Sequence, residues 1–185
     1  NMEGVKRLEG WVKFKGFILI LRPKQWIKNL FLFAGLLFSR NIDKPSYIIT
    51  SFYAFLCFCM VSSTVYIFND IRDIEKDRRH PEKRKRPLAA GVLNRREAQI
   101  LMLLMLPVSA ALSFMLNHSF GFIIMAYLFN NVIYTLYVKN IVILDVMSIA
   151  LGFILRVSGG AVVIGVAISP WLLLCTFLLA LFLGF

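Results

Sequence analysis

The sequence predicts an all-α fold, a multi-span transmembrane helical bundle with about six spans. Hydrophobic residues make up 59% of the 185 positions and the mean hydropathy is +0.74, whereas ordinary globular domains contain roughly 45–50% apolar residues. Apolar runs of about 17 residues or more, long enough to cross a bilayer, recur along the chain. These runs do not alternate polar and apolar residues in period two, which excludes the strands of an outer-membrane barrel.

The first twenty residues predict an amphipathic helix that lies at the membrane interface. Basic and aromatic residues are mixed there: Lys6, Arg7, Lys13, Lys15, Trp11, Phe14 and Phe17. Asn1, which precedes Met2, is expected to be a cloning remnant. We therefore divide the chain into an interfacial segment, residues 1–20, and a transmembrane domain, residues 21–185.

Six apolar segments of this domain are predicted to span the membrane. They cover residues 25–38, 47–68, 98–116, 120–137, a segment after Ile141 and a segment that starts at Ser169. The first is short for a complete span, although Pro23 suits the first turn of a helix. In the fifth, Gly159 and Gly160 permit either close helix packing or a break.

Basic residues are gathered on one side of these spans. Seven of the 21 Lys and Arg residues lie within residues 6–28 and ten lie within residues 72–96, while the loops on the other side hold only Arg40 and Lys44. Since Lys/Arg-rich loops stay in the cytoplasm, we expect a multi-pass protein of the inner (plasma) membrane with both ends in the cytoplasm. The basic clusters adjoin membrane spans, so we expect anionic lipid or substrate as partners and no nucleic acid.

One long polar segment, residues 69–91, interrupts the apolar chain after the second span. Asn69, Asp73 and Asp77 recur every four residues, so on a helix they stack on one face with Asp70 beside them. Carboxylates packed in this way repel one another, and a divalent cation removes the conflict. Mg²⁺ suits such oxygen ligands and completes its coordination with substrate phosphates. We therefore predict Asn69, Asp73 and Asp77 as metal ligands, against the alternative of an ordinary solvated loop.

Basic and aromatic residues near this motif are candidates for binding the phosphates of a substrate. Lys83 and Arg86 follow the motif, and Tyr66 precedes it by three residues and shares its helical face. Lys24 and Lys28 are four residues apart, so they share a helical face of the first span on the same side of the membrane. Each assignment has an alternative. The basic run would serve only to fix the topology, so that Lys83 and Arg86 bind nothing. Lys24 and Lys28 would then be lysines that snorkel to the interface, and Tyr66 would be an interface tyrosine.

Polar residues inside the fourth and fifth spans are also candidates, because polar groups at membrane depth usually face a cavity or another helix. Asn130, Asn131 and Tyr134 lie in the inner half of the fourth span. Asp145 and Arg156 lie on the fifth. They share a helical face, but their positions are about 16 Å apart along the axis, so they cannot pair with each other.

The pattern N-x-x-x-D-x-x-x-D after the second span resembles the first aspartate-rich motif of the UbiA superfamily of intramembrane prenyltransferases. Within that superfamily the chain is most similar to the decaprenyl-phosphate phosphoribosyltransferases. The similarity is carried by RPKQWIKN at residues 22–29, YIFNDIRDIEKDRRHPEKRKRPLAAG at residues 66–91 and LGFILRVSGG at residues 151–160. UbiA-type enzymes have about nine spans and a second polar motif after the sixth. We therefore expect residues 21–185 to resemble the first two thirds of such a domain, truncated at the C-terminus.

The resemblance implies a reaction in which a polyprenyl phosphate of decaprenyl type attacks the anomeric carbon of 5-phosphoribosyl 1-diphosphate, and Mg²⁺-bound diphosphate leaves. The product would be a lipid-linked pentose donor for cell-envelope polysaccharide. By position, Asn69 and Asp73 would ligate Mg²⁺ with Asp77 close by, and Asp70, Asp73 and Asp77 form the catalytic set. The resemblance implies that Lys28, Tyr66, Lys83 and Arg86 would hold the phosphates of the ribosyl donor. Tyr134, Lys139 and Arg156 would complete the cavity, and we add Lys24 beside Lys28 as a further substrate-binding residue. The oligomeric state is left open, a homo-oligomer included.

Three other functions compete with this interpretation. An aromatic prenyltransferase of the same superfamily would use the same Mg²⁺ motif with a polyprenyl diphosphate, but the inner cations exceed what one diphosphate needs. A CDP-alcohol phosphotransferase is disfavoured because no D-G-x-x-A-R block is present. A transporter or scaffold is disfavoured because the sequence shows no clear internal repeat. We expect no metal or catalytic role for Cys57, Cys59, Cys175 and His118.

Overall fold

The computed structural model describes residues 2–39 and 42–184, and every regular element in these ranges is a helix, which confirms the all-α fold. The elements are α1 (Met2–Ile20), η1 (Pro23–Phe33), α2 (Ala34–Phe38), α3 (Pro45–Arg72), α4 (Ile74–Arg79), η2 (Lys83–Lys85), α5 (Arg95–Leu116), α6 (His118–Leu136), η3 (Val138–Asn140), α7 (Val142–Val163) and α8 (Pro170–Gly184). Asn1, which is predicted to be a cloning remnant, lies outside the described residues, and so does Arg40 of the predicted outer loop. The side chains of Lys6 and Arg7 also lie outside them.

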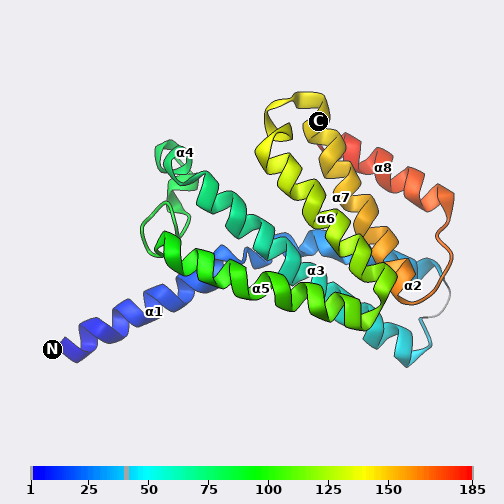
Figure 1. Cartoon of the computed structure of the whole chain (residues 1–185), viewed down its shortest axis with the longest axis horizontal. Coiled ribbons are helices and arrows are strands. Elements are labelled where there is room, and N and C mark those ends of the chain that lie inside the picture. Colours follow the sequence, from blue (N-terminus) through cyan, green and yellow to red (C-terminus); the bar gives the residue numbers. More distant parts are fainter. Residues whose placement is uncertain (1, 40–41, 185) are drawn as a thin grey trace.

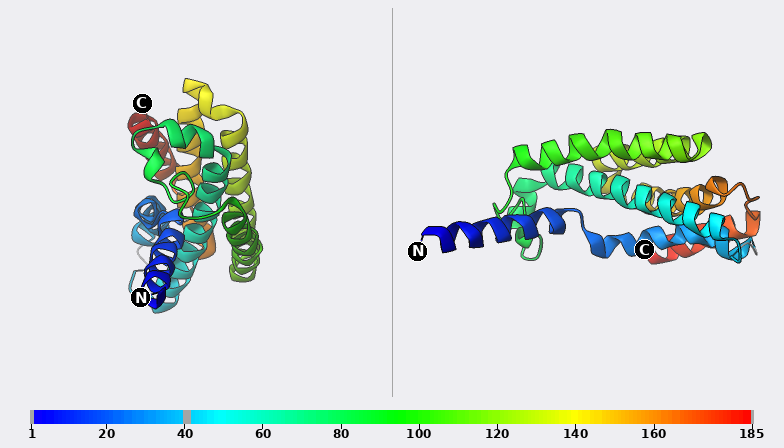
Figure 2. Two further views of the ribbon diagram at one scale, coloured as in Figure 1. Left: turned by 90° about the vertical axis from the view of Figure 1, so that its left-hand side faces the viewer. Right: turned by 90° about the horizontal axis from the view of Figure 1, so that it is seen from below.

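Among the described residues, four helices are long and apolar enough to cross a membrane, namely α3, α5, α6 and α7. The other two predicted spans correspond to shorter elements, because the first consists of η1 followed by α2 and the sixth is α8. The long helix α3 is central and packs against α5, α6, α7 and η1. Figures 1 and 2 show the bundle around α3, with α1 extending away from it.

The first span is not the α-helix that the sequence predicts. The chain breaks after α1 at Arg22, whose φ of 52° places it in the left-handed region. Pro23 then opens η1, an eleven-residue 3-10 helix, and only the five residues of α2 return to α-helical winding. A 3-10 helix has about three residues per turn, so side chains three apart share a face. Lys24 and Lys28, four apart, therefore point in different directions, and the prediction that they share a face is wrong.

The 3-10 winding of η1 matches a three-residue spacing of the residues that it buries. Asn29 and Leu32 are fully buried, and Trp26 donates its ring N–H to the Ser63 hydroxyl of α3 at 3.0 Å. Trp26, Asn29 and Leu32 thus form one stripe along η1. With α-helical winding the three side chains would spread by about 120° around the axis. Burial of this stripe is the physical reason for the departure from the predicted helix.

Close packing of η1 and α2 on α7 depends on two glycines. A Cβ atom on Gly160 would lie 1.8 Å from the Leu32 carbonyl oxygen, and a Cβ on Gly35 would lie 2.7 Å from the backbone nitrogen of Ala161. Neither position can accept a larger residue without moving a backbone. The Gly159-Gly160 pair therefore supports close packing, because α7 continues through it to Val163. This approach brings Asn29 of η1 next to α7.

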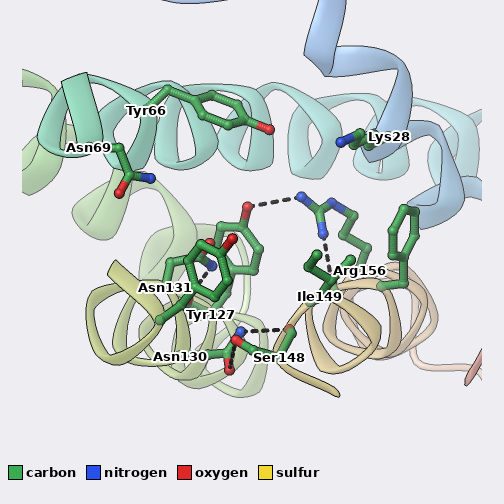
Figure 3. Close-up of a pocket in the computed structure, with 12 residues that line it drawn as sticks. Lys28, Tyr66, Asn69, Tyr127, Asn130, Asn131, Ser148, Ile149 and Arg156 are labelled. Atoms are coloured by element: carbon green, nitrogen blue, oxygen red, sulfur yellow. Dashed lines mark hydrogen bonds between the residues drawn. The ribbon is translucent and has the colours of Figure 1, made fainter. Parts of the chain in front are cut away.

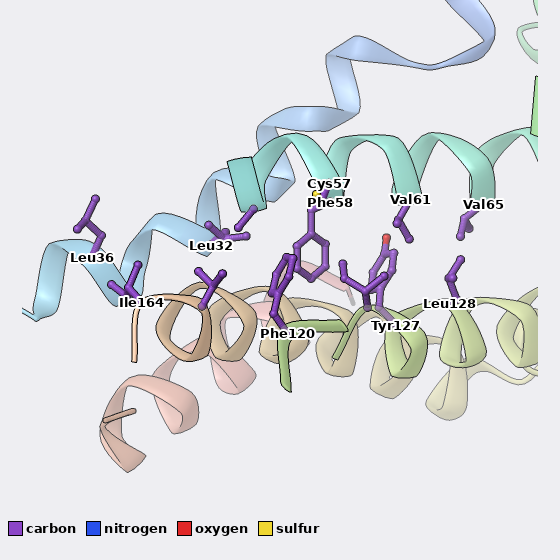
Figure 4. Packing of buried hydrophobic residues seen from close by; sticks show 13 residues of the cluster. Leu32, Leu36, Cys57, Phe58, Val61, Val65, Phe120, Tyr127, Leu128 and Ile164 are labelled. Carbon is purple, nitrogen blue, oxygen red and sulfur yellow. The ribbon is translucent and has the colours of Figure 1, made fainter. Parts of the chain in front are cut away.

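The main hydrophobic core lies where η1, α3, α6 and α7 meet (Figure 4). Phe58 of α3 packs edge to face with Phe120 and Tyr127 of α6, with ring centroids 5.8 and 5.4 Å apart. A second cluster joins the end of α1, the inner end of α3 and the start of α5, and consists of Ile20, Ile67, Ile71, Leu88, Leu93 and Ala98. Because this cluster includes residues before and after the polar segment, it anchors that segment at both ends.

Candidate active site

The predicted motif lies at the junction between α3 and α4. Helix α3 ends at Arg72, Asp73 caps it with φ −98° and ψ 10°, and α4 starts at Ile74. Hydrogen bonds from Asp73 N to the Asn69 carbonyl (3.0 Å) and from Asp77 N to the Asp73 carbonyl (2.8 Å) continue the four-residue spacing across the break. Asn69, Asp73 and Asp77 consequently line one cavity together, as the sequence predicts.

We call this cavity the motif cavity. Its volume is about 320 Å³, and it is lined by Arg22, Tyr66, Asn69, Asp73, Lys76, Asp77, Lys83, Arg86, Tyr134 and Lys139. Five of these side chains are cations and two are carboxylates. Lys76 and Lys83 have no carboxylate partner among the described side chains. The excess of positive charge favours an anionic ligand.

The carboxylates of the motif are already paired with cations. Lys139 Nζ lies 2.8 Å from each carboxylate oxygen of Asp73. Arg86 Nη1 lies 2.6 Å from Asp77 Oδ2 and 3.2 Å from Asp70 Oδ1, and Arg22 also pairs with Asp70. Like-charge repulsion in the motif is therefore relieved by three Arg and Lys side chains, all of which come from outside residues 69–79.

Asp70 does not lie where a catalytic residue would. Its side chain is only 2% exposed, it does not line the motif cavity, and it is held by Arg22 and Arg86. The prediction that Asp70 belongs to the catalytic set does not agree with this placement. Its contacts instead suit a positioning role, because it orients two arginines that line the motif cavity.

A second cavity, the core cavity, adjoins the first and has a volume of about 180 Å³ (Figure 3). It is lined by Lys28, Tyr66, Asn69, Tyr127, Asn130, Asn131, Tyr134, Ser148, Ile149, Gly152, Phe153 and Arg156. Tyr66, Asn69 and Tyr134 line both cavities, so the two meet at the inner ends of α3 and α6. The walls are polar at a depth where α6 and α7 cross the membrane.

Arg156 is the most deeply placed cation of the core cavity and is 5% exposed. Its Nε donates to Asn29 Oδ1 (2.8 Å), its Nη1 to the Gly152 carbonyl (2.7 Å) and its Nη2 to the Tyr127 hydroxyl (2.9 Å). The guanidinium also lies 4.8 Å from the centre of the Tyr127 ring. It has no carboxylate partner among the described side chains, and neither has Lys28 across the cavity. A buried, unpaired cation is unfavourable unless an anion joins it.

Polar residues of α6 are fixed by neighbouring elements. The Ser148 hydroxyl donates to Asn130 Oδ1 (3.0 Å), and Asn130 Nδ2 donates to the Ser148 carbonyl (3.1 Å). Asn131 Nδ2 donates to the Tyr127 carbonyl (2.7 Å). Thr135 donates to Asn69 Oδ1, which orients the amide of the motif. These bonds give the core cavity a rigid polar wall.

Most of the predicted binding residues line a cavity, but the structure groups them differently from the sequence. Lys28 and Arg156 line the core cavity, whereas Lys83, Arg86 and Lys139 line the motif cavity. Lys24 is exposed and lines neither. Three cavity residues, Arg22, Lys76 and Tyr127, were not predicted from the sequence. Asn29, which contacts Arg156 from outside the cavities, was not predicted either, although an amide in an apolar span is a signal.

The donor atoms at the motif suit Mg²⁺. No group of three or more His, Cys, Asp or Glu side chains is arranged to hold a metal within the part of the chain that the structure describes. Mg²⁺ does not need one, because it usually binds through one or two carboxylates and completes its shell with water and substrate phosphates. Asp73 and Asp77, with the Asn69 amide between the two cavities, provide such a partial set.

Comparisons with known proteins find a family model and curated relatives that match this chain. The model of the UbiA prenyltransferase family matches residues 29–185. The chain is 34% identical over 163 residues to the decaprenyl-phosphate phosphoribosyltransferase of Mycolicibacterium smegmatis, covering 86% of this chain and 51% of that protein. It is 36% identical over 173 residues to the protein of the same name from Corynebacterium glutamicum, covering 91% of this chain and 52% of that protein. The chain thus spans about half the length of these curated relatives.

Solved structures share the fold. A UbiA homolog from Archaeoglobus fulgidus bound to GPP and Mg²⁺ aligns with a TM-score of 0.76 at 20% identity, covering 90% of this chain and 60% of that one. A structure described as digeranylgeranylglyceryl phosphate synthase aligns with a TM-score of 0.76 at 23% identity, covering 91% of this chain and 58% of that one. At these identities the likeness concerns the helical membrane fold.

Proposed function

This chain belongs to the UbiA prenyltransferase family, and from that premise we propose that it serves the Mg²⁺-dependent transfer of a 5-phosphoribosyl group from phosphoribosyl diphosphate to a polyprenyl phosphate. The names of relatives at 34% and 36% identity support this choice of donor and acceptor. The product would be a lipid-linked pentose donor for cell-envelope polysaccharide. The protein would lie in the inner membrane with the site facing the cytoplasm, in keeping with the basic residues around the motif.

The observation that carries the proposal is the presence of two adjoining cationic cavities on either side of Asn69 and Tyr134. A polyprenyl diphosphate has one anionic head, which one cluster of cations can bind. A phosphoribosyl donor has a diphosphate and a 5-phosphate, and its acceptor adds a third anionic group. Five cations in the motif cavity suit the donor, while Lys28 and Arg156 suit the single phosphate of the lipid.

This assignment changes the role predicted for Lys28 from the sequence. The sequence grouped Lys28 with Lys83 as contacts of the ribosyl donor. Lys28 lines the core cavity with Arg156, whereas Lys83 lines the motif cavity with Arg86. We therefore assign Lys28 to the acceptor phosphate. Tyr66, Asn69 and Tyr134, which line both cavities, would contact the ribose between them.

In the proposed reaction, a lipid phosphate oxygen forms a bond to the anomeric carbon of the ribose while the bond from that carbon to the diphosphate oxygen breaks. Asp73 and Asp77 would hold Mg²⁺, which when bound neutralises charge on the diphosphate. Arg86, Lys83 and Lys139 stabilise the negative charge that develops on the leaving diphosphate. Arg156 and Lys28 position the attacking phosphate. No general base is required, because a phosphate dianion is already a nucleophile.

The test is ligand binding by the purified protein in lipid nanodiscs with Mg²⁺ present. Isothermal titration and thermal shift would compare phosphoribosyl diphosphate with farnesyl diphosphate plus 4-hydroxybenzoate. We expect phosphoribosyl diphosphate to bind and to raise the melting temperature. When farnesyl phosphate is added, the labelled 5-phosphoribosyl group should be transferred to it with release of diphosphate. Solved UbiA structures with GPP and DMAPP favour a prenyl diphosphate as the alternative donor. Binding of farnesyl diphosphate and the aromatic acid alone would establish the aromatic prenyltransferase, and binding of none would favour a transporter or scaffold.

A further inference from the structure

Asn29 is a buried amide that neither cavity includes, yet it contacts the deepest cation of the site. Its side chain is fully buried between η1, α3 and α7, and its Oδ1 accepts a hydrogen bond from Arg156 Nε at 2.8 Å. A fully buried polar side chain in an apolar span is unfavourable unless its hydrogen bonds are made. The residue therefore has a specific partner to hold.

The orientation of the Asn29 amide is fixed from the other side. Its Nδ2 donates to Ser62 Oγ at 3.1 Å and lies 3.4 Å from Cys59 Sγ. The Ser62 hydroxyl donates its own proton to the Cys59 carbonyl at 3.1 Å, so its oxygen is left as an acceptor for Asn29. Rotation of the amide by 180° would place its NH₂ group against the Nε–H of Arg156, donor against donor. The contacts from α3 thus hold Oδ1 toward Arg156.

The charge of this contact matters as much as its geometry. Arg156 is 5% exposed, and its three hydrogen bonds go to an amide, a backbone carbonyl and a phenol hydroxyl, all of them neutral. An aspartate would fit the same space as Asn29 and would form the stronger, charge-assisted contact. It would also neutralise the guanidinium. A neutral acceptor instead leaves the full positive charge at the wall of the core cavity.

We propose that Asn29 is a positioning residue that holds the Arg156 guanidinium at the core cavity without neutralising it, so that Arg156 can bind the phosphate of the lipid acceptor. The proposal rests on the proposed function for the identity of that anion. The geometry explains why the stripe of η1 carries an amide at this point. Two of the five N–H groups of Arg156 remain for the ligand after its three bonds to the protein.

The decisive variant is Asn29→Asp, compared with Asn117→Asp as a matched control. Asn117 caps the opposite end of α6 by accepting from the Phe120 N–H, a role in which aspartate serves as well. Binding of farnesyl phosphate and of phosphoribosyl diphosphate is measured by titration calorimetry in nanodiscs. We expect Asn29→Asp to weaken farnesyl phosphate binding about 10- to 100-fold, the effect of losing a charge-assisted contact. Phosphoribosyl diphosphate affinity should change by less than about threefold, and the melting temperature should not fall.

A purely structural role for Asn29 makes the opposite prediction. In that case Asn29→Asp would bind farnesyl phosphate like the wild type, and that result overturns the proposal. An equal loss of farnesyl phosphate affinity in Asn29→Asp and in Asn117→Asp also overturns it. If Asn29→Asp does not fold, Ser62→Ala decides. It frees the Asn29 amide to rotate and should weaken farnesyl phosphate binding by about threefold to tenfold, and an unchanged affinity rejects the proposal.

Binding of the donor by the wild type tests the proposed function separately from the role of Asn29. If the wild type binds farnesyl diphosphate but not phosphoribosyl diphosphate, the proposed function fails. Asn29→Asp must then weaken farnesyl diphosphate binding for the role of Asn29 to stand. If the wild type binds phosphoribosyl diphosphate and Asn29→Asp leaves farnesyl phosphate binding unchanged, the proposed function stands and the role of Asn29 is rejected.

Discussion

Replacement of Arg86 by Gln tests whether the cations of the motif hold the fold as well as the ligand. Arg86 lies 2.6 Å from Asp77 and 3.2 Å from Asp70, whose side chains are 4% and 2% exposed. Removing one partner of a buried ion pair leaves an uncompensated charge and typically lowers the free energy of unfolding by about 3–5 kcal/mol. Arg22 still pairs with Asp70. We therefore expect the lower end of that range, about 3 kcal/mol.

Lys85→Gln is the matched control, because it removes a neighbouring ion pair that is exposed. Lys85 and Glu82 lie 3.3 Å apart with side chains 69% and 77% exposed, and such pairs contribute about 0–1 kcal/mol. The free energy of unfolding is measured by titrating sodium dodecyl sulfate into detergent micelles and following circular dichroism. A loss below about 1 kcal/mol for Arg86→Gln, similar to that of Lys85→Gln, would refute the reasoning.

Four further outcomes are expected. Asp73→Asn should lower turnover at least about 100-fold with an unchanged circular dichroism spectrum; activity within about tenfold of the wild type would contradict a role in diphosphate departure. Lys28→Ala should raise the KM for the lipid phosphate about tenfold, whereas Lys24→Ala should leave it within about twofold, because Lys24 lines neither cavity. Equal effects of the two variants would reject the assignment of Lys28 to the acceptor phosphate. Single cysteines at Ser39 and Arg95 should be labelled from opposite sides of the membrane, and labelling from one side would reject the topology. Mg²⁺ should bind at least about fivefold more tightly when inorganic diphosphate is present, as calorimetry would show, and equal affinity would contradict the coupling.

The fold class and the aspartate motif could be predicted from the sequence because both depend on local periodicity. Apolar runs of membrane length identified α3, α5, α6 and α7. Asn69, Asp73 and Asp77 are one turn apart, and the hydrogen bonds across the α3–α4 junction keep that spacing. Lys24 and Lys28 show where the same rule fails. Their shared face assumed about 3.6 residues per turn, whereas burial of Asn29 and Leu32 on one stripe favours three.

The pairing of charges could not be predicted, because the partners are far apart in the sequence. Asp73 and Lys139 are 66 residues apart, and Asn29 and Arg156 are 127 apart. Their contacts depend on the packing of η1 against α7 at Gly160 and of α6 against α3 at Phe58. The sequence showed that Arg156 could not pair with Asp145, but it did not show which groups take the guanidinium instead. Tyr127 carried no signal, since an aromatic residue in an apolar helix is usually core.

The expected coupling between Mg²⁺ and diphosphate follows from the ion pairs of the motif. Lys139 holds both oxygens of Asp73, and Arg86 holds Asp77. A metal ion that takes these carboxylates must displace two cations, and it then repels them. A diphosphate gives the displaced Lys139 and Arg86 new partners and also ligates the metal. Each ligand therefore removes an unfavourable consequence of binding the other, and coupling between sites of this kind is typically about 1–3 kcal/mol. The same pairs explain how the carboxylates of the motif remain close together without a metal.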